Sequence, residues 1–261
     1  MVRIMFIGDI VGYAGCRVVH DNLNNIKKEK NIDFVIANGE NSAVGNGTTK
    51  KSAEYLLLSG VDVLTGGNHT FRKKDFIDYM SNSRQILRPA NYPKGTPGKG
   101  YSVFDFMGIK ICVINICGVV FMEPIRCPFE VLDEILNETE DIKIKILDFH
   151  AEVTSEKRAL AFYADGKISS LLGTHTHVQT SDNEILPNGM SYITDVGMSG
   201  LRYSVLGVKP ECSIKRMREK IPLKFEYEDS GPSKIECAIL DLDENTGKTL
   251  KIERMRFNFE G

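Results

Sequence analysis

Residues 2–9 read VRIMFIGD, a continuous apolar run that ends in Gly8-Asp9. Such a run is typical of a strand buried on both faces, as in the parallel sheet of an α/β protein. Similar runs follow in IDFVIAN (32–38) and VDVLTGG (61–67), and helix-like segments lie at about 15–30, 50–59 and 72–81. This β-α-β-α-β order predicts a parallel sheet with right-handed crossovers and helices on its faces.

The rest of the chain predicts a second sheet. YSVFDF (101–106) and IKICVINI (109–116) flank Met107-Gly108 and indicate an antiparallel hairpin. Further strands are expected in KIKILDF (143–149), ISSLLG (168–173), MSYIT (190–194), KFEYE (224–228), KIECAILDLD (234–243) and TLKIERMRF (249–257), and helices at about 129–138, 154–164 and 210–219. We therefore expect one α/β domain over residues 1–261, with two packed mixed sheets flanked by helices.

Composition and charge exclude several classes of protein. With 33 basic and 35 acidic residues, the formal net charge of −2 argues against a protein that coats nucleic acid, which needs an excess of Lys and Arg. No apolar run approaches the roughly 18 residues that span a bilayer. The six cysteines form no CxxC pair, and the N-terminal stretch lacks the pattern of an export signal. We expect reduced cysteines, no membrane partner and a cytoplasmic location.

Polar residues follow five of the expected strands, where an open α/β sheet binds its ligands. They are Asp9, Glu40-Asn41, Asn68-His69, His150 and the pair His175 and His177. Each has an ordinary explanation alone, because an Asp after a strand is usually a helix N-cap and a lone His usually a hydrogen-bonded structural residue. His175 and His177 carry more weight, since the period of two along a strand would place both imidazoles on one face. Together these residues predict a site at one edge of the sheet.

The donor set has a definite chemical character. Carboxylates, amides and imidazoles without a thiolate suit Mn, Fe, Zn or Co better than Ca or Mg. Seven candidate ligands exceed the needs of one tetrahedral ion and suit two ions that share a carboxylate; they are Asp9, Glu40, Asn41, Asn68, His150, His175 and His177. Two divalent ions, less Asp9, Glu40 and a bridging hydroxide, leave about one positive charge, which matches a phosphodiester monoanion.

The chain resembles the calcineurin-like metallophosphoesterases in the order of these blocks over roughly residues 5–180. The blocks are Gly8-Asp9, Gly39-Glu40-Asn41, Gly66-Gly67-Asn68-His69, His150 and Gly173-Thr174-His175-Thr176-His177. It is most similar to the YmdB-like branch, through Gly39-Glu40-Asn41-Ser42-Ala43, Arg88-Pro89-Ala90-Asn91-Tyr92-Pro93, Asp148-Phe149-His150-Ala151-Glu152 and Thr194-Asp195-Val196-Gly197-Met198. The chain departs from the superfamily pattern in two places. Asp9-Ile10-Val11 stands where the superfamily has Asp-x-His, and Gly39-Glu40 stands where it has Gly-Asp. Both departures are shared with the YmdB-like branch.

The resemblance implies a four-layer αββα sandwich, a two-metal site that commonly holds iron, and a homo-oligomer, either a dimer or a tetramer. It implies phosphodiesterase activity with 2′,3′-cyclic nucleotides among the substrates. On this basis one ion is assigned to Asp9, Glu40, Asn41 and His177, and the other to Glu40, Asn68, His150 and His175. A hydroxide between the ions would attack phosphorus, with His69 as the general acid for the leaving oxygen.

Several alternatives remain open from the sequence. The same centre could serve a phosphomonoesterase or nucleotidase, or a regulatory protein that binds a nucleotide or an RNA end with incidental turnover. His69 could instead be a hydrogen-bonding partner of the ligands. The loop from Phe121 to Phe129 could be a base-stacking lid or ordinary packing, Arg88 could bind phosphate or be structural, and His20 is expected to be an ordinary surface residue.

Overall fold

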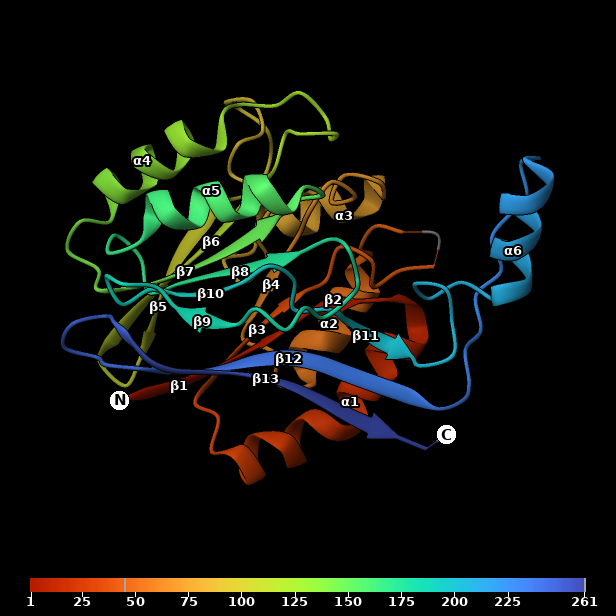
Figure 1. Cartoon of the computed structure of the whole chain (residues 1–261), viewed down its shortest axis with the longest axis horizontal. Helices are drawn as coiled ribbons and strands as arrows, with labels where there is room; N and C mark the ends of the chain where they lie inside the picture. The colour runs from red at the N-terminus through yellow and green to blue at the C-terminus, as the bar shows by residue number, and fades with distance from the viewer. Residues whose placement is uncertain (45, 261) are drawn as a thin grey trace.

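Two β-sheets lie face to face in the middle of the molecule (Figure 1). The computed structural model describes residues 1–44 and 46–260. The strands are β1 (Val2–Ile7), β2 (Asp9–Ile10), β3 (Phe34–Asn38), β4 (Val63–Thr65), β5 (Tyr101–Phe106), β6 (Ile109–Cys117), β7 (Ile144–His150), β8 (Ser170–Thr174), β9 (Glu184–Ile185), β10 (Ser191–Ile193), β11 (Met198–Leu201), β12 (Ser233–Leu242) and β13 (Thr249–Phe259). The first sheet has the order β2-β11-β12-β1-β3-β4 with β13 on β12, and the second has the order β5-β6-β7-β8-β10-β9.

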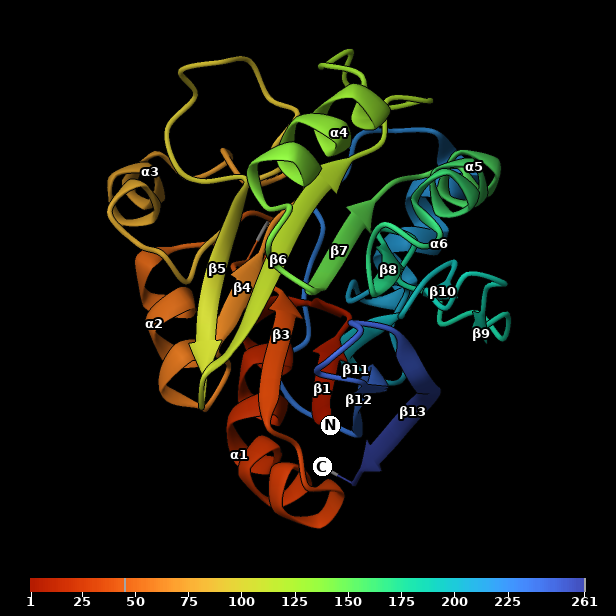
Figure 2. The same cartoon turned by 90° about the vertical axis from the view of Figure 1, so that its left-hand side faces the viewer.

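Five helices cover the outer faces of this pair of sheets: α1 (Gly12–Lys30), α2 (Lys50–Leu58), α3 (Lys74–Ser81), α4 (Pro128–Glu138) and α5 (Thr154–Ala164). A further helix in the described ranges, α6 (Pro210–Glu219), projects away from the sheets (Figure 1). Figure 2 shows α1 and α2 against the first sheet and α4 and α5 on the opposite side, against the second. None of the helices in the described ranges is long and apolar enough to cross a membrane.

The apolar runs explain why both faces of each sheet are covered. In β1, Met5 and Ile7 pack against the helices, whereas Ile4 and Phe6 face the second sheet. Side chains on both faces of the strand are buried, so polar and apolar residues do not alternate along it. The two packed mixed sheets predicted from the sequence are confirmed.

The parallel opening and the hairpin are also as predicted. β1, β3 and β4 pair in parallel, and β5 pairs antiparallel with β6. Met107 and Gly108 both have positive φ, 51° and 86°, as a two-residue hairpin turn with the twist of the flanking strands requires.

The strand predicted over 224–228 is wrong. Of these residues only Tyr227 takes part in strand-like pairing, as a single bridge to Val208. The alternating side chains favoured a strand, but the segment leaves the body of the molecule together with α6, away from the edges of both sheets (Figure 1).

Candidate metal centre

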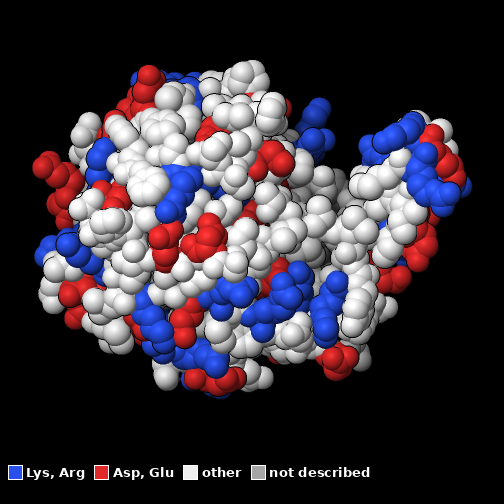
Figure 3. All heavy atoms as spheres, viewed as in Figure 1, with Lys and Arg blue, Asp and Glu red and all other residues white. Residues whose placement is uncertain are grey.

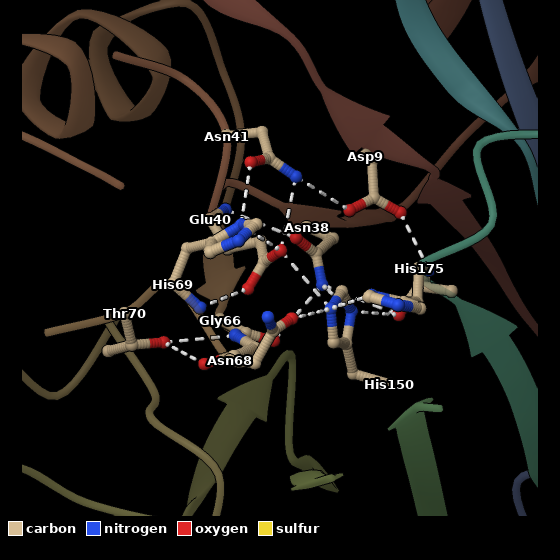
Figure 4. A network of polar contacts seen from close by, with 12 residues as sticks. Asp9, Asn38, Glu40, Asn41, Gly66, Asn68, His69, Thr70, His150 and His175 are labelled. Carbon is tan, nitrogen blue, oxygen red and sulfur yellow. Dashed lines mark hydrogen bonds and ion pairs between the residues drawn. The ribbon is translucent and has the colours of Figure 1, made fainter. Parts of the chain in front are cut away.

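The polar residues at the strand ends meet at one edge of the two sheets (Figure 4). The first sheet supplies the carboxylates and amides, because Asp9 follows β1, Glu40 and Asn41 follow β3, and Asn68 and His69 follow β4. The second sheet supplies three imidazoles: His150 ends β7, and His175 and His177 follow β8. The structure thus brings all eight predicted residues together.

Glu40 lies at the centre of the cluster. Its side chain is fully buried, and Oε1 lies 3.0 Å from His69 Nδ1 and 3.1 Å from His150 Nε2. The other oxygen, Oε2, accepts a hydrogen bond of 2.9 Å from the backbone N–H of His69. A Cβ atom at Gly67 would lie 2.2 Å from Glu40 Oε2 and 2.5 Å from His150 Nε2. Glycine at position 67 is therefore what lets both side chains enter the cluster.

One group of donors forms around His150. Its Nε2 lies 3.0 Å from Asn68 Oδ1 and 3.1 Å from His175 Nδ1, in addition to the contact with Glu40. Donor atoms of Glu40, His150 and His175 all lie within 4.8 Å of one another, close enough to share an ion.

A second group forms around Asn41 and also includes Glu40. Asn41 Nδ2 lies 3.1 Å from Glu40 Oε1, 3.4 Å from Asp9 Oδ1 and 3.2 Å from His177 Nε2. His177 Nε2 lies 3.5 Å from Asp9 Oδ1. A rotation of the Asn41 amide by half a turn exchanges its nitrogen and oxygen, so this side chain can present an oxygen at the same place.

Buried histidines keep the two carboxylates ionised. Burial by itself raises the pKa of Glu40, but charge interactions and hydrogen bonds with His150 and His69 outweigh it and hold that pKa well below its usual range. The pKa of Asp9 is lowered in the same way, since His177 and His150 outweigh the effect of burial. Burial lowers the pKa of His150, yet Glu40 and Asp9 raise it to about 9. Without a metal, a proton on His150 balances buried negative charge that a cation can balance instead.

A buried relay fixes which nitrogen of His150 faces the cluster. Nδ1 lies 2.8 Å from Thr174 Oγ1, and the Thr174 hydroxyl donates to Asp148 Oδ1 at 2.7 Å. Because the hydroxyl has one proton and gives it to Asp148, it accepts from the Nδ1–H of His150. Burial raises the pKa of Asp148 to about 6, so this carboxylate is still ionised at neutral pH. His150 Nε2 is thereby the nitrogen that faces Glu40, as a metal ligand requires.

His175 and His177 follow a strand as predicted, but the strand period that was expected to place both imidazoles on one face does not apply to them. β8 ends at Thr174, and the two histidines follow in a loop with φ of 103° and 64°. These left-handed conformations are uncommon for residues other than glycine and persist where surrounding contacts impose them. The imidazoles reach the same cluster through the path of the loop and not through the period of a strand.

A buried ion pair holds that loop. Lys157 Nζ donates to the carbonyl of Thr174 at 2.8 Å and lies 3.0 Å from Asp195 Oδ2. Asp195 Oδ2 also accepts the backbone N–H of Thr176 at 3.0 Å. On the other side, Asp9 Oδ2 accepts the backbone N–H of His175 at 3.1 Å. Both charged side chains of the ion pair are fully buried, so the loop is anchored from beneath.

His69 lies beside the donors and borders a cavity. Its Nδ1 is 3.0 Å from both Glu40 Oε1 and Asn41 Oδ1. Nε2 is 3.5 Å from Asn46 Nδ2, and the ring lines the cavity described below. This position agrees with a group that acts next to the metal ions without binding them.

The sequence reasoning gave no role to the buried groups behind the ligands. Asn38 donates to Asp148 Oδ2 at 2.9 Å, and Lys157 and Asp195 hold the histidine loop. Asn38 and Asp148 did leave a signal, since each is a polar residue inside an apolar, buried strand. Lys157 lies on the buried face of α5, but the sequence contains no signal that distinguishes it from a surface lysine.

Arg88 is structural, one of its two predicted alternatives. Its guanidinium donates to four backbone carbonyls, those of Pro89, Ala90, Thr96 and Pro97. With its N–H groups used in this way and the side chain buried, Arg88 supports the loop after β4.

The donor set fits transition-metal ions. His150 Nε2 faces three donor atoms within 3.1 Å, those of Glu40, Asn68 and His175, which is more than a single N–H can serve. Oxygen and imidazole donors together suit Mn, Fe, Co or Zn. No cysteine belongs to the cluster found among the described residues.

Comparisons with known proteins identify the family and similar structures. The sequence model of a family described as YmdB-like protein matches residues 5–255. The 2′,3′-cyclic-nucleotide 2′-phosphodiesterase of Bacillus subtilis (strain 168) is 44% identical over 258 residues, which cover 98% of this chain and 97% of the relative. A solved structure from Mycoplasma pneumoniae, described as a novel phosphatase, has a TM-score of 0.93 and 36% identity over 99% of this chain and 94% of that one.

A more distant structure shares the fold alone. The NAD nucleotidase of Haemophilus influenzae has a TM-score of 0.59 at 13% identity, over 98% of this chain and 55% of that one. The predicted four-layer αββα sandwich is confirmed. Since the family match extends over nearly the whole chain, the chain belongs to the YmdB-like family.

Proposed function

We propose that this protein is a two-metal phosphodiesterase that opens the cyclic phosphate of 2′,3′-cyclic nucleotides, the substrate class in the name of the Bacillus subtilis relative. The observation that carries the proposal is the sharing of Glu40 by two groups of donors beside one cavity, with His69 next to them. Water adds to phosphorus, one phosphorus–oxygen bond to the ribose breaks, and the released oxygen takes a proton.

We propose for two ions the same division of ligands that was predicted from the sequence. Asp9, Glu40, Asn41 and His177 would hold one ion, and Glu40, Asn68, His150 and His175 would hold the other. Two bound ions would neutralise phosphate charge and make a water molecule acidic enough to react near neutral pH. Iron is our first expectation, and Mn or Zn suits the same donors.

His69 would donate the proton to the leaving oxygen. Its Nδ1 lies 3.0 Å from Glu40 Oε1, which orients the ring with the other nitrogen toward the cavity. A positioned acid of this kind contributes a factor of roughly 10²–10⁴ to the rate.

Metal analysis and turnover test the proposal together. Protein purified without added metal is expected to hold about two transition-metal ions per chain and to hydrolyse 2′,3′-cyclic AMP. His69→Ala should keep the metals but react about 10²–10⁴ times more slowly, whereas Asn68→Ala and His150→Ala should lose metal. His20→Ala is the matched control, because His20 is exposed and contacts Ser59 and Tyr55 far from the cluster.

Each outcome bears on a different part of the proposal. His69→Ala with the wild-type rate would remove the acid assignment. Wild-type protein that holds metal and binds nucleotides tightly, but hydrolyses no phosphodiester, would instead support a regulatory binding protein.

A phosphomonoesterase is the second candidate, because the Mycoplasma pneumoniae structure is described as a phosphatase. Comparing kcat/KM for bis-p-nitrophenyl phosphate and p-nitrophenyl phosphate decides between the two ester classes. A homo-oligomer, a cytoplasmic location and action on RNA ends stay predictions.

A further inference from the structure

Residues 202–232, which connect β11 to β12 and which we call the arm, stand apart from the two sheets. The arm contains α6, which projects to one side of the molecule in Figure 1. The space-filling view in Figure 3 shows a hollow between α6 and the body. The arm contacts the body near both of its ends, where Gly207 lies against Val11 and Arg17 donates to the carbonyl of Asp229, whereas α6 faces the body across the hollow.

A cavity of about 450 Å³ joins the arm to the metal centre. One wall is polar and contains Glu40, Asn41, His69, His175 and His177. The opposite wall comes from the arm and is mainly apolar, with Val205, Leu206, Val208, Met217, Phe225 and Tyr227. A volume of this size is in the usual range for a small-molecule site.

Apolar surface on the arm wall is uncovered. Leu206 is 48% exposed, Met217 is 65% exposed and Phe225 is 37% exposed. Arg216 stacks over the ring of Phe225 at 4.5 Å, but it lines a neighbouring hollow and not this cavity. An aromatic ring backed by a guanidinium and bordered by a methionine suits a flat aromatic group, because stacking and contact with polarisable sulfur both favour it.

The charges around the cavity further restrict the class of ligand that it can bind. Among the described residues that line it there is no Lys or Arg. The lining includes the carboxylate of Glu152, which disfavours a second phosphate where no cation offsets it. The cavity beyond the reacting phosphate therefore favours an uncharged group with apolar faces and a polar edge, as a nucleobase is.

A polar strip runs from the arm to the candidate acid. The hydroxyl of Tyr227 is 3.5 Å from Asn46 Oδ1, and Asn46 Nδ2 is 3.5 Å from His69 Nε2. Asn46 thus lies between the apolar wall and His69, at the border where the ribose of a nucleotide would join its base to its phosphate.

We propose that the arm is the nucleobase subsite of this enzyme, with Phe225, Leu206 and Met217 against the base. This rests on the proposed phosphodiesterase function and adds a specificity determinant to it. Stacking on one aromatic side chain is expected to change KM about tenfold, with little effect on kcat, since the base is remote from the reacting bond.

The test compares two substrates that differ only in the base. Wild-type protein should show a KM for 2′,3′-cyclic AMP at least tenfold below that for ribose 2′,3′-cyclic phosphate. Phe225→Ala should raise the KM for 2′,3′-cyclic AMP about tenfold and leave both kcat and the base-free substrate unchanged, and Phe225→Leu should fall between. Phe121→Ala is the matched control, because Phe121 is 90% exposed and lies in the loop that was the alternative base-stacking lid.

Several results would overturn the subsite. One is an equal KM for the two substrates with wild-type protein. Another is a KM that rises in Phe121→Ala and not in Phe225→Ala. The third is a changed oligomeric state of Phe225→Ala with an unchanged KM, which would make the arm wall an interface between copies of the chain. Thermal melting of each variant separates loss of the subsite from loss of the fold.

Failure of the proposed function looks different from failure of the subsite. If neither substrate is hydrolysed, the function fails, and the subsite is judged by calorimetric binding of adenosine 3′-phosphate to wild type and Phe225→Ala. Equal affinities there would overturn the subsite as well, and a tenfold weaker variant would support it.

Discussion

At the scale of single residues, the hydroxyl of Thr174 connects a buried carboxylate to a candidate metal ligand. It donates to Asp148 and accepts from His150, so it sets both the proton and the orientation of the imidazole. Partners of this kind, one step behind the ligands, typically account for a factor of 10–100 in metal affinity.

Thr174→Val should therefore weaken metal binding roughly 10–100-fold while the fold persists. The substitution keeps the shape of the side chain but removes the oxygen, so His150 loses the acceptor that keeps its proton on Nδ1. Titration calorimetry of the metal-free protein with Mn²⁺ measures the change. Thr249→Val is a matched control, because Thr249 is also buried and bonded through its hydroxyl, to Ser169 O at 2.7 Å. Equal loss in both variants would refute the relay.

At the scale of elements, the sequence predicted the strands better than it predicted the loops. Continuous apolar runs identified β1, β3 and β7, and their ends located Asp9, Glu40 and His150. These features are local, because burial on both faces leaves its mark in every residue of a strand. The loop of His175 and His177 could not be predicted, because its φ angles depend on contacts with Lys157 and Asp195, which are remote in sequence or carry no pattern. The arm was misjudged for the same reason, since no local signal tells whether a sheet edge is available.

Lys157→Met tests how much the loop depends on its anchor. The variant leaves the Asp195 carboxylate buried without its partner, so a loss of about 3–5 kcal/mol in the free energy of unfolding is expected. Urea denaturation of the metal-free protein measures it. Lys167→Met removes the same charge from an exposed pair with Asp133, whose side chains are 43% and 46% exposed, and should cost at most about 1 kcal/mol. Similar losses in the two variants would show that the buried pair is not the anchor.

At the scale of the whole molecule, the metal centre lies across the seam between the two sheets. Asp9, Glu40, Asn41 and Asn68 come from the first sheet, and His150, His175 and His177 from the second. The inner faces of the sheets are also joined by apolar packing and by buried hydrogen bonds such as that of Asn38 to Asp148. Ions bound at this edge would therefore connect the two halves of the sandwich directly. They would stabilise the folded state and not the unfolded chain, which does not hold these donors together.

Metal binding should accordingly raise the melting temperature of the whole protein in one transition. At a free metal concentration about 1,000 times Kd each bound ion contributes about 4 kcal/mol, and one such contribution corresponds to roughly 8–16 °C for a chain of this size. Calorimetry of chelator-treated protein with and without added Mn²⁺ measures the shift. Glu40→Gln, which alters the ligand shared by both groups, should abolish most of it, whereas His20→Ala should keep it. An ion bound by both sheets must stabilise both of them in the same unfolding transition. Metal that shifts only a partial transition, or a melting-temperature shift in Glu40→Gln equal to that of wild type, would therefore show that the ions do not join the two sheets.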